Sequence, residues 1–320
     1  MPVALAPMAG ITDLPYRRVV AGFGAGLVVS EMVASREMVA ARGDARARAE
    51  LGLGEQCSAV QLAGREPHWM AEAARLVESG GARLIDINFG CPAKKVTGGQ
   101  SGAALMREPD RALRLVEAVV GAVRVPVTLK MRLGWDHDSL NAPQIARRAE
   151  AAGVRMVTIH GRTRNQLYTG RADWAAIRRV RDAVTIPVLA NGDIVDAASA
   201  RAALDASGAD GVMVGRGAQG MPWRLAQIAA QLGGTRAPAA PRGAALADLV
   251  ARHYEAMLDF HGRDTGLRAA RKHLGWYLDA AGAPADLRRA VVTARAPIEV
   301  LRLLRAALEP LRDPAREAAA

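Results

Sequence analysis

The stretch PDRALRLVEAVVGAVRVPVTLKMRL, residues 109–133, contains one copy of the pattern that decides the fold of this chain. Its first part has small and aliphatic residues on one side at helical spacing and charged residues on the other, so it predicts an amphipathic helix over Pro109–Val123. Asp110 suits the start of that helix. Its second part, Val125–Leu133, is a short apolar run without alternation, as in parallel strands buried on both faces. The stretch therefore predicts a helix followed by a buried strand.

Similar apolar runs recur along the first two thirds of the chain, with amphipathic stretches between most of them. The eight predicted strands are Val3–Met8, Leu27–Met32, Ser58–Ala63, Leu84–Gly90, Val125–Leu133, Met156–Gly161, Ile186–Asp193 and Gly211–Arg216. Eight such units predict an α/β fold of the (β/α)8 TIM barrel type. A doubly wound sheet is the alternative, but it more often carries its glycine-rich turn after the first strand. Here the richest glycine turn, Gly215–Gly220, follows the last strand.

The sequence after the barrel changes character. We assign residues 1–234 to the barrel and residues 235–241, TRAPAAP, to a linker. Residues 242–320 predict a small all-α domain with amphipathic helices over 243–262, 265–281 and 284–309, and with a frayed end at 313–320.

Composition limits the possible classes of protein. Of 320 residues, 50% are hydrophobic, which excludes disorder as the main state. No apolar run is long enough to span a membrane, and the start MPVALAPMAG lacks the features of a secretory signal, so we expect a cytoplasmic protein. The two cysteines, Cys57 and Cys91, are too few for a disulfide scaffold, a four-thiolate zinc site or an iron–sulfur cluster. We expect no metal.

The charge balance favours a partner that carries phosphates. Lys and Arg total 43 against 32 Asp and Glu, for a formal net charge of +11. Codon bias explains why the chain has Arg in place of Lys, since its only lysines are Lys94, Lys95, Lys130 and Lys272. Bias does not explain the excess of cations over anions, so a nucleic acid is the better interpretation.

Every predicted strand ends in a polar or glycine-rich group. In order they are Pro7-Met8-Ala9, Glu31, Gln61, Asn88 with Cys91, Lys130 with Arg132, His160, Asn191-Gly192-Asp193 and Gly215-Arg216. Barrel enzymes carry their active sites at the carboxyl ends of the strands, so these groups are expected to form one site.

The turn GRGAQG, residues 215–220, matches the pattern G-x-G-x-x-G. A Rossmann dinucleotide site is disfavoured, because no acidic residue lies about twenty residues further on and the turn follows the last strand. In a barrel, this turn and Asn191-Gly192-Asp193 are suited to hold a phosphate. With Gln61 and Lys130 placed to contact a pyrimidine edge and the N1–O2 side of a ring, the set suits a flavin.

The two cysteines differ in their predicted environments. Cys57 is interpreted as a small buried hydrophobe, whereas Cys91 lies on a loop just past a strand end. The segment AKKVTGGQSG, residues 93–102, which follows it, has the glycines of a mobile lid. A thiol there can act as a nucleophile or as a general acid, and the absence of a recognisable Cys–His–Asn arrangement favours the acid.

One segment of the tail suggests RNA binding. Arg268, Arg271, Lys272 and Trp276 occur at helical spacing, which suits phosphate contacts and base stacking. A solvated face with Trp276 in a core is an equally good interpretation.

The chain resembles the tRNA-dihydrouridine synthase family over essentially its whole length. The resemblance rests on the motifs APMAGITD (6–13), QLAG (61–64), DINFGCP (86–92) with Lys94-Lys95, KMR (130–132), HGRTR (160–164), NGD (191–193) and GRG (215–217). The segment Arg268–Tyr277 is similar to the bacterial B-type subgroup, which is associated with position 17 of the D-loop. The family reduces the C5–C6 double bond of a uridine in tRNA with FMN and NADPH.

The resemblance implies a role for each matched residue. Cys91 is implied to be the general acid that protonates C5 while hydride reaches C6. The implied FMN-binding residues are Pro7, Met8, Ala9, Gln61, Lys130, His160, Asn191, Gly192, Asp193, Gly215 and Arg216. The implied substrate or RNA residues are Asn88, Lys94, Lys95, Arg132, Tyr168, Arg171, Arg268, Arg271 and Lys272.

The expected partners are bound FMN, NADPH or NADH as reductant, and tRNA, with no membrane, metal or obligate protein partner. One alternative is a flavin barrel that acts on a free dihydropyrimidine-like molecule, which would need neither the tail nor the positive charge. The other is a non-enzymatic RNA-binding protein that kept the barrel and binds no flavin.

Overall fold

The structure is a computed structural model that describes residues 2–50 and 58–311. The chain divides into two compact units. The first contains Met1–Gly217 and Leu225–Arg236, and the second contains Ala218–Arg224 and Ala237–Ala320. The short segment Ala218–Arg224 lies within the range predicted for the barrel, yet it groups with the helical unit. The assignment of the parts to a catalytic and an RNA-binding domain stays a prediction.

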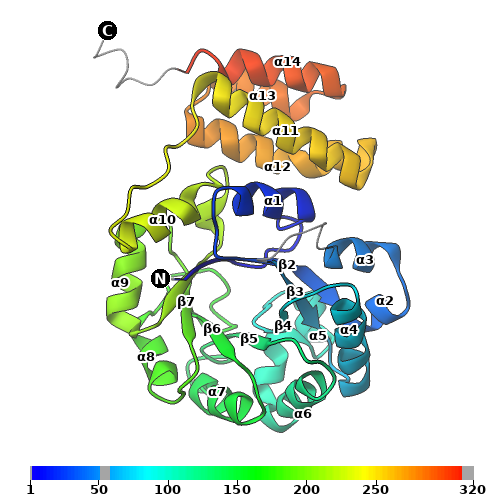
Figure 1. The fold of residues 1–320 in the computed structure, drawn as a ribbon, viewed down its shortest axis with the longest axis vertical. Helices are drawn as coiled ribbons and strands as arrows, with labels where there is room; N and C mark the ends of the chain where they lie inside the picture. The colour runs from blue at the N-terminus through cyan, green and yellow to red at the C-terminus, as the bar shows by residue number, and fades with distance from the viewer. Residues whose placement is uncertain (1, 51–57, 312–320) are drawn as a thin grey trace. The chain divides into compact units, whose positions relative to one another are not determined.

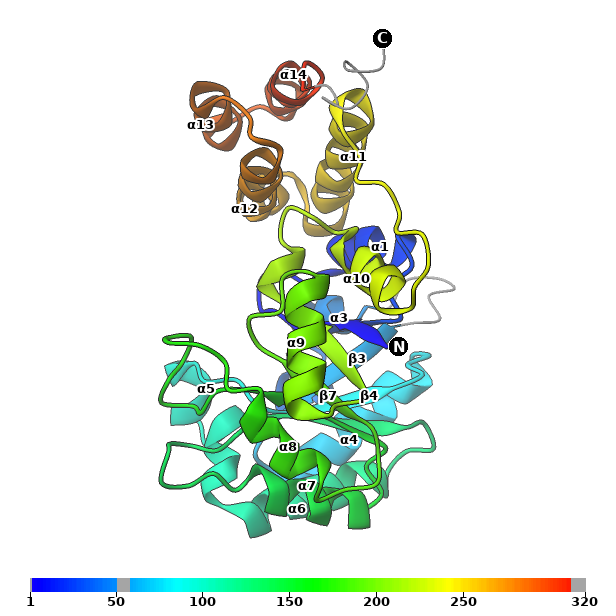
Figure 2. The ribbon, with the colours of Figure 1, turned by 90° about the vertical axis from the view of Figure 1, so that its left-hand side faces the viewer.

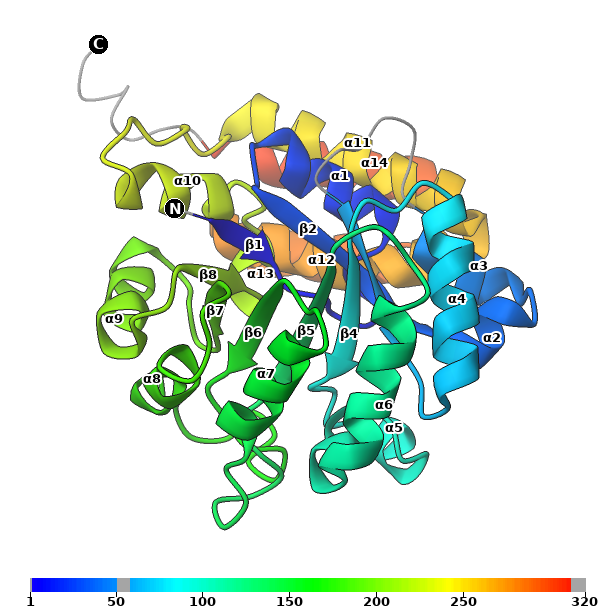
Figure 3. The same ribbon diagram turned by 60° about the horizontal axis from the view of Figure 1, so that its bottom comes forward.

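The first unit is a closed barrel of parallel strands, each paired with the next along the chain and the last with the first (Figure 3). The strands are β1 (Val3–Leu5), β2 (Leu27–Ala34), β3 (Ser58–Ala63), β4 (Ile85–Phe89), β5 (Val127–Arg132), β6 (Met156–His160), β7 (Val188–Asn191) and β8 (Gly211–Val214). The predicted (β/α)8 barrel is confirmed. Its strands are buried throughout most of their length, which explains their unbroken apolar sequence.

Helices surround the barrel (Figure 1). They are α1 (Leu14–Gly22), α2 (Ser35–Val39), α3 (Gly43–Ala49), α4 (Pro67–Ser79), α5 (Lys94–Gly98), η1 (Gly102–Arg107), α6 (Pro109–Val120), α7 (Ala142–Ala151), α8 (Ala175–Arg181), α9 (Ala197–Ser207), η2 (Arg216–Ala218) and α10 (Arg224–Leu232). Helix α6 buries the aliphatic face that its sequence predicts, and it ends at Val120 rather than Val123. The short elements α5 and η1 follow β4, so the loop after Cys91 is folded.

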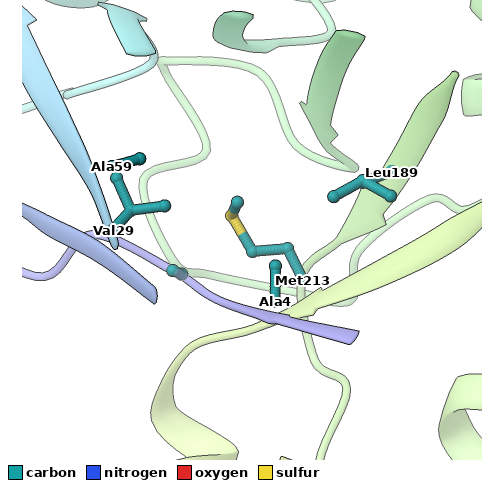
Figure 4. Close-up of a cluster of buried hydrophobic side chains, with 6 residues drawn as sticks. Ala4, Val29, Ala59, Leu189 and Met213 are labelled. Atoms are coloured by element: carbon teal, nitrogen blue, oxygen red, sulfur yellow. The ribbon is translucent and has the colours of Figure 1, made fainter. Parts of the chain in front are cut away.

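The interior of the barrel is apolar towards the amino ends of its strands. Figure 4 shows part of this cluster of buried side chains. It consists of Ala4, Ala6, Val29, Ala59, Leu189 and Met213. Because side chains alternate along a strand, the next inward positions towards the carboxyl ends include Gln61, Lys130 and Asn191. The barrel therefore has an apolar layer beneath a polar one.

The second unit is helical over the residues that the structure describes, as predicted from the tail. Its helices, which are labelled in Figure 2, are α11 (Gly243–His261), α12 (Arg263–Ala281), α13 (Ala285–Thr293) and α14 (Pro297–Leu308). The single helix expected over 284–309 is wrong, because the chain is extended at Ala294 and Ala296. Pro297 disfavours helical backbone at the residue before it, and it starts a new helix instead. The frayed end expected at 313–320 lies outside the described residues.

Within the described ranges, no helix combines the length and the apolar character that crossing a bilayer requires.

The apolar layer yields a prediction about stability. Leu189 is 1% exposed inside the barrel, so Leu189→Ala should lower the free energy of unfolding by about 2–5 kcal/mol, through lost burial and a residual cavity. Leu76 on α4 is 41% exposed, and Leu76→Ala should change it by less than about 0.5 kcal/mol. Denaturant titration followed by circular dichroism measures both. Equal losses for the two variants would contradict this packing.

Candidate active site at the carboxyl end of the barrel

The strand register brings the predicted residues to one end of the barrel. Asn88 on β4 pairs with Lys130 on β5, and Arg132 pairs with His160 on β6. His160 in turn pairs with Asn191 on β7. These positions are the last or nearly the last of their strands, so five side chains from four neighbouring strands converge.

A series of side-chain hydrogen bonds links β3, β4 and β5. The Nδ2 atom of Asn88 donates to Oε1 of Gln61 at 2.7 Å, and Nε2 of Gln61 donates to Oδ2 of Asp86 at 2.6 Å. The other oxygen of Asp86 accepts from the hydroxyl of Thr128 at 2.6 Å. All four side chains are buried. Asp86 and Thr128 were not among the predicted site residues, although Asp86 lies within the DINFGCP motif.

The turn that carries Cys91 is held by side chains of the site. The Oδ1 atom of Asn88 accepts from the backbone N–H groups of Gly90 at 3.2 Å and Cys91 at 2.9 Å. Arg132 Nε donates to the Gly90 carbonyl at 2.9 Å. Cys91 itself is half-buried. A half-buried thiol on a fixed turn remains accessible to a substrate above the barrel.

Gly102 brings the far end of the cysteine loop back to the turn. Its φ is +60°, and a Cβ there would lie 2.8 Å from the Cys91 carbonyl oxygen. The next residue, Ala103, donates its N–H to that same carbonyl at 3.1 Å. Gly102 is therefore required for close approach, and the loop is closed at its base by backbone contact.

Lys130 is the buried cation of the site. It is 9% exposed, and its Nζ donates to Oδ1 of Asn191 at 3.0 Å. Burial and the nearby charge of Arg132 lower the pKa of Lys130 to about 8, while the charges of Asp86 and Cys91 oppose that change. Its ammonium is thus poised to lose its proton within an accessible pH range.

Arg132 and Arg216 flank an exposed aromatic ring. The guanidinium carbons of Arg132 and Arg216 lie 5.5 and 5.3 Å from the centre of the Tyr168 ring, which is 56% exposed. Arg132 also donates to the Thr163 and Leu167 carbonyls at 2.7 and 2.8 Å, and burial lowers its pKa to about 10. Arg132 therefore orders the loop after β6 and presents Tyr168 as a stacking surface.

Arg162 is a central residue that the sequence analysis missed. It is 1% exposed and pairs with both carboxylate oxygens of Asp193 at 3.0 and 2.6 Å. It also lies 3.3 Å from Nε2 of His160. Burial, followed by the charges of Lys130, Arg132, Arg162 and Arg216, lowers the pKa of His160 well below its ordinary value. The His160 imidazole is therefore neutral at physiological pH. In the sequence, Arg162 could have been found from its place in the HGRTR motif.

Asp193 joins the two loops that were predicted to hold a phosphate. Burial alone would raise the pKa of Asp193, but hydrogen bonds from Arg162 and Ala172 and the charges of Arg162 and Arg216 lower it overall. Its Oδ1 atom accepts from Arg216 at 3.2 Å. The carboxylate therefore positions two guanidinium groups, and it is a poor direct ligand for an anion.

The backbone of these loops fits a phosphate. Within the described part of the chain, the N–H groups of Gly192, Gly215 and Arg216 donate to no acceptor. A Cβ on Gly217 would lie 2.6 Å from the Ile194 carbonyl oxygen, so the turn is tight. At Gly215 a Cβ would meet no atom closer than 3.7 Å, which leaves room above the turn. Free N–H groups beside the guanidinium of Arg216 suit an anion.

Other predicted residues lie in the loops around this end. Residues 7–9 follow β1, where Met8 is fixed by a hydrogen bond from its N–H to Thr12 Oγ1 at 3.0 Å. Glu31 is buried on β2. Lys94 and Lys95 on α5 and Arg171 after β6 are exposed. The interpretation of Cys57 lies outside the described residues.

The predicted RNA-binding residues of the tail belong to the second unit, and they differ in exposure. Arg268 and Arg271 on α12 are exposed, whereas Lys272 is half-buried. Trp276 is half-buried, and its ring centre lies 5.3 Å from that of His273 in an edge-to-face contact. The two arginines are available to a partner, while Trp276 is partly committed to packing.

No cluster of three or more His, Cys, Asp or Glu side chains that could hold a metal occurs among the described residues. The functional groups described at this end of the barrel include a thiol, a buried ammonium, several guanidinium groups and neutral amides. This set can hold a flat polar ring and a phosphate, and it can deliver a proton from sulfur.

Comparison with known proteins places the chain among tRNA-modifying enzymes. The family described as "Dihydrouridine synthase (Dus)" matches residues 4–311. A protein of Rhodobacter capsulatus named "Probable tRNA-dihydrouridine synthase" is 68% identical over 96% of this chain and 94% of its own length. A protein of Xanthomonas axonopodis named "tRNA-dihydrouridine synthase B" is 46% identical over 95% of this chain and 91% of its own length.

A comparison of structures finds a likeness in fold alone. The structure of histamine dehydrogenase from Rhizobium sp. 4-9 matches with a TM-score of 0.52 and 12% identity. The match covers 79% of this chain and 48% of that one.

The buried ammonium yields a prediction about pH. Lysine labelled with a heavy carbon isotope should give one resonance for each of Lys94, Lys95, Lys130 and Lys272. In the flavin-free protein, the Lys130 signal should titrate at about pH 8, below the ordinary 10.5, because burial and Arg132 disfavour the ammonium. Asp86→Asn should lower the midpoint further, since the carboxylate stabilises the charged form.

Loss of one resonance in Lys130→Arg assigns the signal. Asp110→Asn is the matched control for Asp86→Asn, because Asp110 is exposed and pairs with Arg148 instead. A Lys130 midpoint near its ordinary value would contradict the described environment.

Proposed function

The chain belongs to the dihydrouridine synthase family, and we propose on that basis that it reduces a uridine of tRNA to dihydrouridine. The observation that carries the proposal is the placement of Cys91 and Lys130. Asn88, which holds the Cys91 turn, pairs in register with Lys130 on the neighbouring strand. A proton donor and a buried cation thus lie together at the carboxyl end of the barrel.

The proposed cofactor is FMN, reduced by NADPH or NADH. When bound, the flavin supplies hydride to C6 of the uracil ring. Gly192, Gly215 and Arg216 hold the phosphate, Gln61 contacts the pyrimidine edge, and Lys130 stabilises negative charge at the N1–O2 side. Pro7, Met8, Ala9, His160, Asn191 and Asp193 complete the proposed FMN-binding residues. Support comes from the free N–H groups of both turns and from the buried ammonium.

Cys91 is the proposed general acid. As hydride adds to C6, the electron pair of the double bond moves to C5, and the Cys91 thiol donates the proton that forms the C5–H bond. The thiolate then recovers a proton from solvent. Asn88, Arg132 and Tyr168 are proposed to hold the base, and Tyr168 presents an exposed ring for stacking.

The proposed substrate is folded tRNA rather than a free base. A net charge of +11 and exposed cations, including Lys94, Lys95, Arg171, Arg268 and Arg271, suit a large polyanion. On the resemblance of Arg268–Tyr277 to the B-type subgroup, the proposed target is position 17 of the D-loop. We place the protein in the cytoplasm, with its proposed substrate.

The proposed acid can be tested by removing its thiol. Cys91→Ala should lower uridine reduction by about 10²–10⁴-fold, the usual effect of losing a general acid. Flavin content and reduction of the flavin by NADPH should not change, because neither needs a proton donor facing uracil. Mass spectrometry of digested tRNA and anaerobic stopped-flow absorbance measure these effects.

The second cysteine provides the control, since Cys57→Ala removes a thiol of no proposed role and should leave all three readouts unchanged. Normal tRNA modification by Cys91→Ala would exclude the thiol as the acid.

The proposed tail contacts yield a separate prediction. Replacing Arg268, Arg271 and Lys272 with Ala should weaken tRNA binding and reduce its dependence on salt, because each phosphate contact releases counterions. Reduction of the bound flavin should be unaffected. Filter binding across a salt series measures both quantities. If affinity and salt slope both match wild type, the three residues are a solvated face and the contacts lie elsewhere, first of all at Lys94 and Lys95.

A further inference from the structure

Asp86 is a buried carboxylate that has no part in the chemistry described so far. It is the second residue of β4, is 3% exposed, and faces side chains of β3 and β5. Burial raises the pKa of Asp86, while hydrogen bonds from Thr128 and Gln61 and the charge of Lys130 oppose that rise. Burying a carboxylate costs free energy, so we expect Asp86 to have neighbours whose positions depend on it.

The hydrogen bonds that start at Asp86 have only one consistent direction. Both oxygens of Asp86 accept, one from Thr128 and the other from Nε2 of Gln61, which leaves Oε1 of Gln61 facing Asn88. That oxygen draws Nδ2 of Asn88, and Oδ1 of Asn88 is left facing the turn. The turn offers two donors there, the N–H groups of Gly90 and Cys91. An acceptor at one end and donors at the other thus fix both amides.

We propose that Asp86 is a positioning residue of the reaction, which acts through Gln61 and Asn88 to hold the turn that presents Cys91. This inference rests on the proposed function only in taking Cys91 as the proton donor. The series also decides which atoms remain for ligands. Gln61 and Asn88 each keep one amide N–H free of this series, so both residues can donate to a ligand.

The test uses two replacements of Asp86 that differ in one property. Asp86→Asn removes the charge but keeps an oxygen that accepts from Gln61. Asp86→Leu has similar bulk and removes the acceptor, so Gln61 and then Asn88 lose their fixed orientation. Both are made in a Cys57→Ala background so that Cys91 is the only thiol.

The first readout needs neither flavin nor tRNA. It is the rate at which iodoacetamide alkylates Cys91 in the flavin-free protein, followed by intact mass. Asp86→Leu should raise this rate by roughly two- to tenfold, which corresponds to the loss of one hydrogen bond. Asp86→Asn should stay close to wild type. Asp110→Leu, at an exposed aspartate of α6, is the matched control and should also stay close to wild type.

The second readout is turnover of unmodified tRNA at saturating FMN and NADPH. In Asp86→Leu the kcat should fall about tenfold with a smaller change in the KM for tRNA, because the thiol is misplaced while the phosphate contacts of the RNA persist. Asp86→Asn should recover most of that kcat when both variants are assayed at a pH where Lys130 stays protonated, because loss of the carboxylate charge also lowers the Lys130 pKa. A role limited to folding stability would not produce rescue by the amide.

Two results overturn the proposal. One is a wild-type rate of Cys91 alkylation in folded Asp86→Leu. The other is an Asp86→Asn variant that alkylates as fast as Asp86→Leu, which would show that the acceptor is irrelevant. If Asp86→Leu does not fold, Gln61→Leu interrupts the same series at its next link and must raise the alkylation rate instead. If wild type fails to reduce tRNA, the proposed function fails, while alkylation still decides the role of Asp86.

Discussion

A closed barrel leaves the inward side chains of its strands no partners except one another. In this chain the inward positions change from apolar near the amino ends to polar near the carboxyl ends. The polar ones include a carboxylate at Asp86 and an ammonium at Lys130, each of which is costly to bury alone. Hydrogen bonds with the side-chain amides of Gln61 and Asn191 satisfy the carboxylate and the ammonium. The geometry of the site depends on these hydrogen bonds. Gln61 is bonded through Asn88 to the backbone of Cys91, and Asn191 donates to the Met213 carbonyl on β8.

The outer loops repeat that principle with guanidinium groups. Arg132 and Arg162 are each about as buried as a core leucine, and both bind backbone carbonyls of the loop after β6. Arg162 also neutralises Asp193, which then positions Arg216 beside the turns proposed to hold a phosphate. Lys94, Lys95 and Arg171 are exposed and available to a partner. Buried arginines thus shape the site.

The sequence was sufficient for the barrel, because unbroken apolar strands alternating with amphipathic helices have few other solutions. It also identified Cys91 and Lys130, since a cysteine on a post-strand loop and a lysine in a buried strand are both unusual. Arg162 was missed because its pairing with Asp193 joins residues far apart in sequence. Asp86 was not singled out within its motif, because its role depends on hydrogen bonds with Gln61 on β3 and Thr128 on β5 that the sequence does not show. The break before Pro297 was readable from proline chemistry and was overlooked.

The most direct test of the account concerns what the flavin-loaded protein reduces. Purified protein with NADPH can be given unmodified tRNA in one reaction and free uracil or orotate in another, under anaerobic conditions. The account predicts that NADPH oxidation is coupled to tRNA alone and that the product gains two hydrogen atoms at a single D-loop uridine. Turnover of the free bases, or none with tRNA by protein that carries reducible flavin, would contradict it.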